Sequence, residues 1–453
     1  MATPTRLLPA DADRFQRRNK HMNTTNETKP LDLDSLKKAV IKNAAAFRCR
    51  RRFQPAGGAG DKVFPPTFSG AVYAVEQRRV FGTDGKVLAQ PVTCVVLDTV
   101  QSQANRMEQA LQDALDGGRI TIPVLKVDFS KWSPTGKEEE AKRFVDDVGT
   151  ITSLQVPHRV ADAILRDSEI EEELGGKKVK LPFRKSSKGK ALNTVSQQNA
   201  TALYELCPTA LIFGMWDSTG PKGGLGAKFE RAMVSEVIGV GATVGDLVRG
   251  VRRDPLEIRA AVKVLKPADK NWSLAAANAN SAVSPSEINH GSVPFPKQRD
   301  EKTDKNLYAG ATIEYAEQLT TLSLIALRRL CFPAPDNTSP EIDAAGRTVL
   351  AALGLCAATL AFESGMGLRS RCLLWPEAAM SWELLEKPGD IPKKFSLTGD
   401  EAVALLEAAV AAAASVGLNW EGAPVELVPQ QKLVDLVRLS QLEATKEENQ
   451  DAK

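Results

Sequence analysis

The sequence has little of what enzymes commonly use for catalysis or metal binding. Only three of its 453 residues are histidines, and His21, His158 and His290 are scattered along the chain. None of the six cysteines forms a C-x-x-C pair, so a structural zinc site is not expected. Clustered carboxylates for a metal-dependent nuclease and a Ser/His/Asp set are also missing. We therefore expect no metal, no cofactor and no catalytic residue.

Long hydrophobic runs are absent too. The N-terminus lacks the apolar core of a signal peptide. The most apolar stretch, Val349 to Phe362, is too short to span a bilayer and is interpreted as a buried helix. Several cysteines lie in apolar runs, as is typical of buried, reduced thiols in a cytosolic protein. These features predict a cytoplasmic protein without membrane contact.

Glycine-rich segments are present, but their spacing excludes the common nucleotide-binding loops. Gly220 to Lys228 resembles a phosphate loop, yet Phe229 stands where a Ser or Thr would hold magnesium. Gly239 to Gly245 lacks the G-x-G-x-x-G spacing of a dinucleotide fingerprint. An NTPase or a dinucleotide-dependent enzyme is therefore not predicted.

What the chain does contain is a series of Arg and Lys residues beside glycines or at helix starts. Net charge is only +3, so the placement of charge matters more than its sum. Residues 177 to 190 hold seven basic residues and no acid, and are interpreted as an exposed, mobile loop. A second cluster, Arg48 to Arg52, is expected just before the first core strand. Phe53, Phe183 and Phe229 could stack on bases near these cations, or could belong to the core.

The segment from Pro91 to Leu115 has the clearest local pattern. A β-branched apolar run predicts a strand to Leu97, and a helical period begins at Val100. Asp98 and Thr99 are candidate N-caps. The helix start is rich in neutral hydrogen-bonding side chains and one guanidinium, and helix N-termini favour phosphate. The alternative is an ordinary polar helix face.

Strands and helices follow one another irregularly along the chain, which predicts an α+β fold. A long amphipathic helix is expected from Tyr308 to Cys331 and a strand from Ala210 to Trp216. A helical pattern also covers Leu154 to Leu165. Residues 1 to about 30 are polar and patternless and are expected to form a flexible tail.

Short blocks in a fixed order resemble a known family over about residues 47 to 380. They are RFQPAGG (52–58), VVLDTVQSQANRMEQAL (95–111), TSLQVPHRVADA (152–163), LCPTALIFGMWDS (206–218), GLGAKFERAMVSEVIG (224–239), GSVPF (291–295) and GLRSRCLL (367–374). Together they resemble the CRISPR-associated RAMP backbone subunit of type I-G (formerly I-U) Cascade. The resemblance implies an RRM-like, ferredoxin-like palm (the RAMP fold) with large inserted thumb loops and extra helices.

The domain boundaries follow from this resemblance. Residues 1–46 would form a flexible tail and an N-terminal helix. Residues 47–390 would form the RAMP core, with the thumb inserted at about 130–200. Residues 391–453 would form a C-terminal helical segment and a polar tail.

The resemblance also implies a function. Such subunits polymerise as a helical filament along a CRISPR guide RNA and support its pairing with target DNA in antiviral defence. Their partners are the other Cascade subunits (a large subunit and a guide-processing subunit) and a recruited helicase–nuclease, and the backbone subunit itself is not an enzyme. An alternative is a RAMP endoribonuclease that cuts RNA through an acidic thumb-loop residue, Asp146 or Asp147.

Carried onto this chain, the resemblance and the basic motifs predict an RNA-binding set. The predicted residues are Arg52, Gln54, Gln101, Ser102, Asn105, Arg106, His158, Arg159, Lys185, Lys188, Lys222, Lys228, Arg231, Arg369 and Arg371. In this set the cations and amides hold the RNA backbone, while base pairing reads the sequence.

Overall fold

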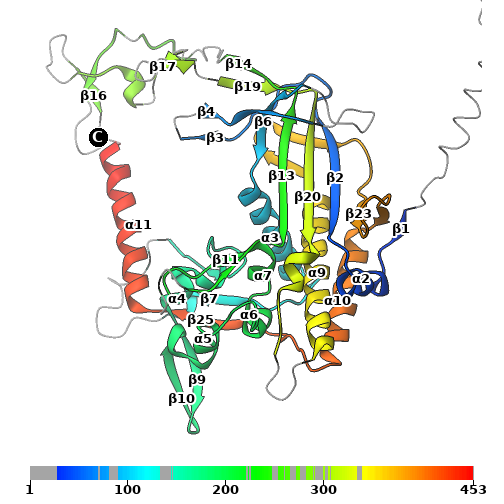
Figure 1. Ribbon diagram of the computed structural model, residues 1–453. Helices are drawn as coiled ribbons and strands as arrows, with labels where there is room; N and C mark the ends of the chain where they lie inside the picture. Colours follow the sequence, from blue (N-terminus) through cyan, green and yellow to red (C-terminus); the bar gives the residue numbers. More distant parts are fainter. Residues whose placement is uncertain are drawn as a thin grey trace, which may run out of the picture.

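The computed structural model describes most of the chain from residue 28 onward (Figure 1). The described residues are 28–69, 72–80, 90–132, 144, 146–220, 223, 226–246, 254–259, 261–265, 272–275, 282–288, 290, 299–300, 305–306, 308–333 and 339–451. Nearly all of the expected N-terminal tail, the block 291–295 and the predicted site residue Lys222 lie outside these residues.

A ten-stranded sheet forms the centre of the protein. Its main path runs in the order β1 (Lys29–Pro30), β24 (Lys393–Ser396), β23 (Trp382–Leu385), β2 (Ala46–Pro55), β20 (Tyr315–Ser323), β13 (Met233–Val240), β6 (Val92–Asp98) and β5 (Val75–Arg78). The hairpin of β21 (Met366–Arg369) and β22 (Cys372–Pro376) joins it at β2. All of these pairs are antiparallel except β1 with β24. The observed mixture of sheets and helices confirms the predicted α+β class.

Two helices connect the central strands. Between β2 and β13 the chain passes through α3 (Val100–Asp116), and between β20 and β23 it passes through α9 (Pro340–Glu363). The connection through α3 joins β2 to β13, which run in the same direction on either side of the antiparallel strand β20. The connection through α9 joins β20 to β23, which run in the same direction on either side of the antiparallel strand β2. The two helices pack on each other against one face of the sheet, as Figure 1 shows.

Helix α9 is the centre of the hydrophobic core. It packs against α3, α10 (Gly399–Ala414) and α2 (Leu33–Ile41). Its length and composition would allow a membrane span, but 83% of its most apolar window is buried inside the fold. This is the environment of a core helix, and it confirms the expectation of a buried helix around Val349 to Phe362.

A second sheet has five strands in the order β10 (Lys177–Pro182), β9 (Ser168–Leu174), β25 (Val425–Pro429), β7 (Leu125–Asp128) and β8 (Thr150–Thr152). Helix α4 (Ala163–Arg166) and the 3-10 turns η1 (Phe129–Lys131) and η4 (Phe183–Lys185) pack against this sheet. Helix α5 (Ser187–Leu192) contacts η4 and α6 (Thr201–Leu206), while α7 (Thr209–Phe213) contacts the 3-10 turn η3 (Arg159–Ala161), α9 and β13. Helix α11 (Gln431–Asp451) leaves this sheet and stands apart from the main one in Figure 1.

The remaining described elements are short. Two-stranded pairs are formed by β3 (Thr67–Phe68) with β4 (Val72–Tyr73), β11 (Met215–Trp216) with β12 (Lys228–Phe229), β14 (Thr243–Asp246) with β19 (Tyr308–Thr312), β15 (Val264–Leu265) with β16 (Ser273–Leu274), and β17 (Arg299–Asp300) with β18 (Lys305–Asn306). Helix α8 (Leu324–Arg328) and the 3-10 turn η6 (Pro285–Ile288) complete the set. All six cysteines are unpaired and five are buried, as predicted for reduced thiols.

The predicted helix from Tyr308 to Cys331 is wrong, because this segment contains β19, β20 and only the short α8. The apolar residues recur here at three-residue steps, which resembles a helical face. In β20, however, Ala316, Gln318, Thr320 and Leu322 are buried at period two, and Leu319 is exposed. Because Gln318 and Thr320 are polar although buried, the sequence does not show the alternation of apolar and polar residues that is typical of a strand.

The basic segment 177–190 is not a loop, contrary to the prediction. It forms β10, η4 and α5. Strand β9 supplies the opposite charges, since Lys178 pairs in register with Glu173 and Lys180 with Glu171. Oppositely charged cross-strand neighbours stabilise an antiparallel pair, so the lysine-rich sequence is compatible with a strand.

Three smaller expectations also need correction. Residues 210–216 form the end of α7 and β11 rather than one strand, and residues 154–165 are mostly turns before α4. The arginines from Arg48 to Arg52 lie within β2, not before it.

Candidate nucleic-acid interface

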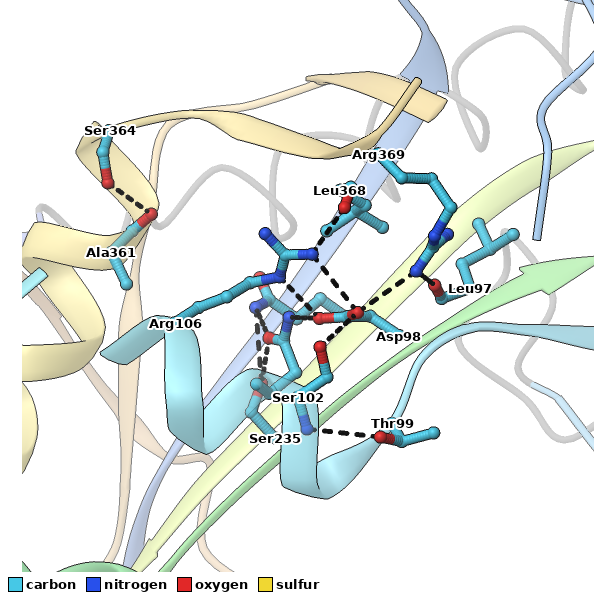
Figure 2. A network of polar contacts seen from close by, with 12 residues as sticks. Leu97, Asp98, Thr99, Ser102, Arg106, Ser235, Ala361, Ser364, Leu368 and Arg369 are labelled. Atoms are coloured by element: carbon cyan, nitrogen blue, oxygen red, sulfur yellow. Dashed lines mark hydrogen bonds and ion pairs between the residues drawn. The ribbon is translucent and has the colours of Figure 1, made fainter. Parts of the chain in front are cut away.

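The junction of β6 and α3 is organised by Asp98, whose side chain is almost fully buried (Figure 2). Thr99, not Asp98, caps the helix by accepting a 3.2 Å hydrogen bond from the Ser102 backbone N–H. The Asp98 carboxylate instead accepts hydrogen bonds from Ser102 Oγ (2.8 Å), Gln103 Nε2 (2.6 Å) and Arg106 Nε (2.8 Å). Asp98 thus supplies the negative charge at the helix start.

Arg369 reaches the same carboxylate from the β21–β22 hairpin, with Nη2 3.4 Å from Asp98 Oδ1 and 2.7 Å from the Leu97 carbonyl. Arg106 Nη2 donates to the Leu368 carbonyl at 2.6 Å. We call Asp98, Ser102, Gln103, Arg106 and Arg369 the Asp98 cluster. It joins two blocks that are far apart in the sequence, and its two guanidinium groups face one carboxylate.

A buried polar network continues from the Asp98 cluster into the sheet. Gln103 Oε1 accepts hydrogen bonds from Ser235 Oγ (2.9 Å) and Gln318 Nε2 (2.7 Å). Ser235 also bonds to Thr320 at 2.8 Å. These bonds fix the first turn of α3 to β13 and β20. Apolar periodicity did not identify Ser235 or Gln318, because both are polar residues inside the core.

A cleft of about 600 Å³ opens beside the same helix start. Five predicted residues line it and come from three separate segments: Gln101; His158 and Arg159; Lys228 and Arg231. Arg231 Nη2 donates a 2.7 Å hydrogen bond to Gln101 Oε1, which connects α3 to the segment after β12. The tertiary structure therefore brings together residues that the sequence only marked as separate weak signals.

Arg159 forms a buried wall of the cleft rather than an open cation. It is 5% exposed and has a left-handed backbone, with φ of 51°. Its guanidinium makes a bidentate ion pair with Glu108 of α3 (2.7 and 2.8 Å) and donates to the Gly214 carbonyl at 2.9 Å. Burial raises the pKa of Glu108 to about 6, and Arg159 opposes that rise. Arg159 thus ties the β11 turn to α3.

Gly214 allows β11 and β12 to approach each other. Its φ is +83°, and a Cβ there would lie 3.1 Å from the Phe229 carbonyl oxygen. After Gly214 the two strands pair in antiparallel register, with Met215 opposite Phe229 and Trp216 opposite Lys228. The Lys228 ammonium lies 5.6 Å from the Trp216 ring centroid. A larger residue at position 214 would strain this arrangement.

Trp216 is the residue of this site that the sequence reading missed. The sequence predicts it as the end of an apolar strand, but its side chain is 53% exposed and lines the cleft. A tryptophan two residues after a glycine, at the end of an apolar run, was the available signal. The three phenylalanines considered for stacking, Phe53, Phe183 and Phe229, are all buried, which confirms the core alternative for each.

The charge of the cleft is predominantly positive. The carboxylate of Glu230 pairs with Arg329, and that of Asp217, just outside the lining, pairs with Arg184 at 2.9 Å. Among the described residues, Lys228 and Arg231 have no acidic partner. We call Gln101, His158, Trp216, Lys228 and Arg231 the cationic cleft.

The other predicted residues lie elsewhere. On the sheet face opposite α3 and α9, the Arg52 guanidinium stacks 4.2 Å from the Tyr315 ring centroid, and Gln54 donates to the Glu314 carbonyl. Arg371 stacks on Phe64 at 4.3 Å in the β21–β22 turn. Lys188 pairs with Glu421.

Lys185 belongs to η4, and Asn105 accepts a long 3.4 Å hydrogen bond from Gln101. The two acids of the alternative hypothesis are exposed and do not line the cleft. Asp146 is held through its backbone by Gln441 of α11, and Asp147 accepts a hydrogen bond from the Gly149 N–H at 3.1 Å. In the described part of the chain, no group of three or more His, Cys, Asp or Glu side chains could hold a metal ion.

Part of the chain matches a known protein family. Residues 47–244 match the family described as CRISPR-associated protein GSU0053 (Cas_GSU0053). The matched span begins in β2, ends in β14 and contains every residue that lines the cleft, but not the β21–β22 hairpin. No curated protein matches the chain. The match indicates that the chain is a CRISPR-associated protein.

Proposed function

We propose that this chain is the guide-RNA-binding backbone subunit of a type I-G Cascade, a RAMP protein that holds RNA without cutting it. The observation that carries the proposal is the cationic cleft. Gln101, His158 and the two cations Lys228 and Arg231 come from separate segments and face one open space. Neither cation has an acidic partner in the part of the chain that the structure describes. Unpaired cations and neutral hydrogen-bond donors around a groove are what a phosphodiester backbone requires.

The connectivity of the main sheet supports the RAMP assignment. The path β2–α3–β13–β20–α9–β23 is a β-α-β-β-α-β series, and its spatial order β23-β2-β20-β13 is that of a ferredoxin-like palm. Other strands and the second sheet are additions to this unit. The family match to a CRISPR-associated protein points in the same direction.

The chemistry of the cleft favours holding over cutting. Among the described residues of its lining, Glu230 is the one carboxylate, and it is neutralised by Arg329. The candidates for an endoribonuclease, Asp146 and Asp147, are outside the lining. That alternative predicts loss of RNA cleavage in an Asp146→Ala/Asp147→Ala variant, whereas a backbone subunit keeps its function in this variant.

In this proposal, copies of the chain assemble along the guide RNA in the cytoplasm, and the bound guide pairs with target DNA. The large subunit, the guide-processing subunit and a recruited helicase–nuclease are the partners, and no cofactor is needed. Guide sequence is read by base pairing, so the protein binds different guides with similar affinity.

The test is co-expression of the full chain with a CRISPR array. We expect the purified protein to carry RNA of guide length and to run as a large assembly. A nucleic-acid-free monomer from the same cells would overturn the proposal. A Lys228→Ala/Arg231→Ala variant should lose most of the RNA, while a Lys38→Ala/Lys394→Ala control, which removes the same charge from α2 and β24, should retain it.

A further inference from the structure

We propose that Trp216 is a stacking platform for a base of the bound RNA. The inference rests on the proposed function and adds to it a contact with the bases, beyond the cations that hold the backbone. It assigns a role to the one aromatic side chain that the described lining of the cleft presents to solvent.

The exposure of Trp216 is unusual for its environment. The other aromatic residues of the lining, Phe213 and Phe229, are buried at 1% and 5% exposure, whereas Trp216 is 53% exposed. A large indole surface left open inside a concave site is a binding surface more often than a packing residue. Lys228 approaches the ring at 5.6 Å, and the remaining exposed area is large enough for a second contact.

The backbone that carries the ring is held in place before any ligand binds. Strand β11 is fixed to β12 by the pairs Met215–Phe229 and Trp216–Lys228. The Gly214 carbonyl just before it accepts a hydrogen bond from Arg159, which is itself locked by Glu108. Since the backbone of β11 is already ordered by these contacts, binding a base does not require this segment to fold first.

The groups around the ring select a nucleotide over an apolar peptide. The cations Lys228 and Arg231 can contact phosphates, and Gln101 can donate or accept at a base edge. A ligand with a flat π surface joined to an anionic backbone matches both features. Single-stranded RNA has this composition, and every base offers a face for stacking on an aromatic ring.

The experiment measures binding of a fluorescein-labelled uridine 12-mer to the full chain by anisotropy at several salt concentrations. Trp216→Ala should weaken binding roughly ten- to hundredfold without changing the slope of log K against log salt. Trp216→Phe should recover part of the loss. Lys228→Ala should instead reduce the slope by about one, because it removes a phosphate contact. Trp375→Ala, at a 72% exposed tryptophan on β22, is the matched control and should bind like the wild type.

A second probe is a 12-mer of abasic ribose phosphate. The wild type and Trp216→Ala should bind it equally, because it has no base to stack. Equal binding of the uridine 12-mer by these two proteins would overturn the stacking role, and so would a loss that persists with the abasic probe. In both cases wild-type binding to RNA would still support the proposed function. Failure of the wild type to bind the uridine 12-mer would overturn both proposals.

Discussion

The Asp98 cluster and the cationic cleft begin at the same turn of α3, but their charges are arranged differently. In the Asp98 cluster, Arg106 and Arg369 surround a buried carboxylate and donate to backbone carbonyls. In the cationic cleft, Lys228 and Arg231 face solvent and lack an acidic partner among the described residues. An arginine at a helix start can therefore join two elements of the protein, and its position in the sequence does not distinguish this role from phosphate binding.

The largest effect is expected from Asp98→Asn, which tests whether the Asp98 cluster is structural. The variant keeps the shape of the side chain but leaves two guanidinium groups next to a neutral amide. The free energy of unfolding should fall by about 4 kcal/mol, since breaking a buried charge cluster leaves uncompensated charge. Chemical denaturation measures this. The exposed pair Arg119–Asp400 is the control, and Asp400→Asn should change stability by less than about 1 kcal/mol. If Asp98→Asn is as stable as the wild type, the Asp98 cluster is not structural, and its difference from the cationic cleft is refuted.

Arg159→Met should have the next largest effect, because Arg159 lines the cleft but, like the arginines of the Asp98 cluster, pairs with a buried carboxylate. Methionine fills part of the space but leaves Glu108 without its partner. The free energy of unfolding should therefore fall by about 3 kcal/mol at pH 7. The loss should be smaller at pH 5, where Glu108 can take up a proton. Thermal unfolding at the two pH values tests this, with Arg329→Met at the exposed Arg329–Glu230 pair as the control. An equal loss at both pH values would contradict the assignment of the effect to the Glu108 charge.

Glu108 should also give the wild type its own pH dependence. Its pKa is raised to about 6 in the folded protein from an ordinary value of 4.5, so the folded protein binds this proton more tightly than the unfolded chain. Protonation of Glu108 therefore adds about 2 kcal/mol to the free energy of unfolding. This contribution is fully present below pH 4.5 and is lost as the pH rises through 6. The difference in unfolding free energy between wild type and Glu108→Gln, measured from pH 4 to pH 7, isolates this contribution. If this difference does not change between pH 4 and pH 7, the ion pair with Arg159 fully offsets the effect of burial on the pKa of Glu108.

The smallest effect is expected from Gln101→Ala. This residue adjoins the Asp98 cluster in sequence but belongs to the cleft in space. Its side chain is exposed, so stability should change by less than about 0.5 kcal/mol. RNA affinity should fall two- to threefold, because Arg231 loses the hydrogen bond that positions it. The matched variant Ser102→Ala should show the reverse pattern, with lower stability and unchanged RNA affinity.

Local patterns predicted the elements that obey a single period. Residues 92–97 and the helix from Val100 agree with β6 and α3, because strand alternation gives way to helical spacing at one clear boundary. The sequence does not indicate β20, because its buried face carries Gln318 and Thr320, which hydrogen-bond to partners from other elements. Burial of a polar side chain depends on tertiary partners, and one strand alone does not reveal them.

The site was predictable in composition but not in geometry. Basic residues near glycines marked separate segments, and the structure brings Gln101, His158, Lys228 and Arg231 from these segments into one cleft. The partnership of Arg369 with Asp98 spans 271 positions and leaves no local trace. The same holds for Arg159 and Glu108, whose ion pair converts a predicted RNA contact into an internal support.

Strand β25 has a consequence for how the protein is made. It lies between β7 and β9, parallel to the first and antiparallel to the second, although it follows both by more than 240 residues in the chain. When a ribosome has completed the main sheet and α10, the strands β7 and β9 still lack their shared neighbour. Exposed strand edges favour aggregation, so this region needs protection until residues 425–429 emerge. Closing such a long loop is also slow. Assembly of the second sheet is thus a late step in folding, and a ribosome stalled before β25 would release a chain with two open edges.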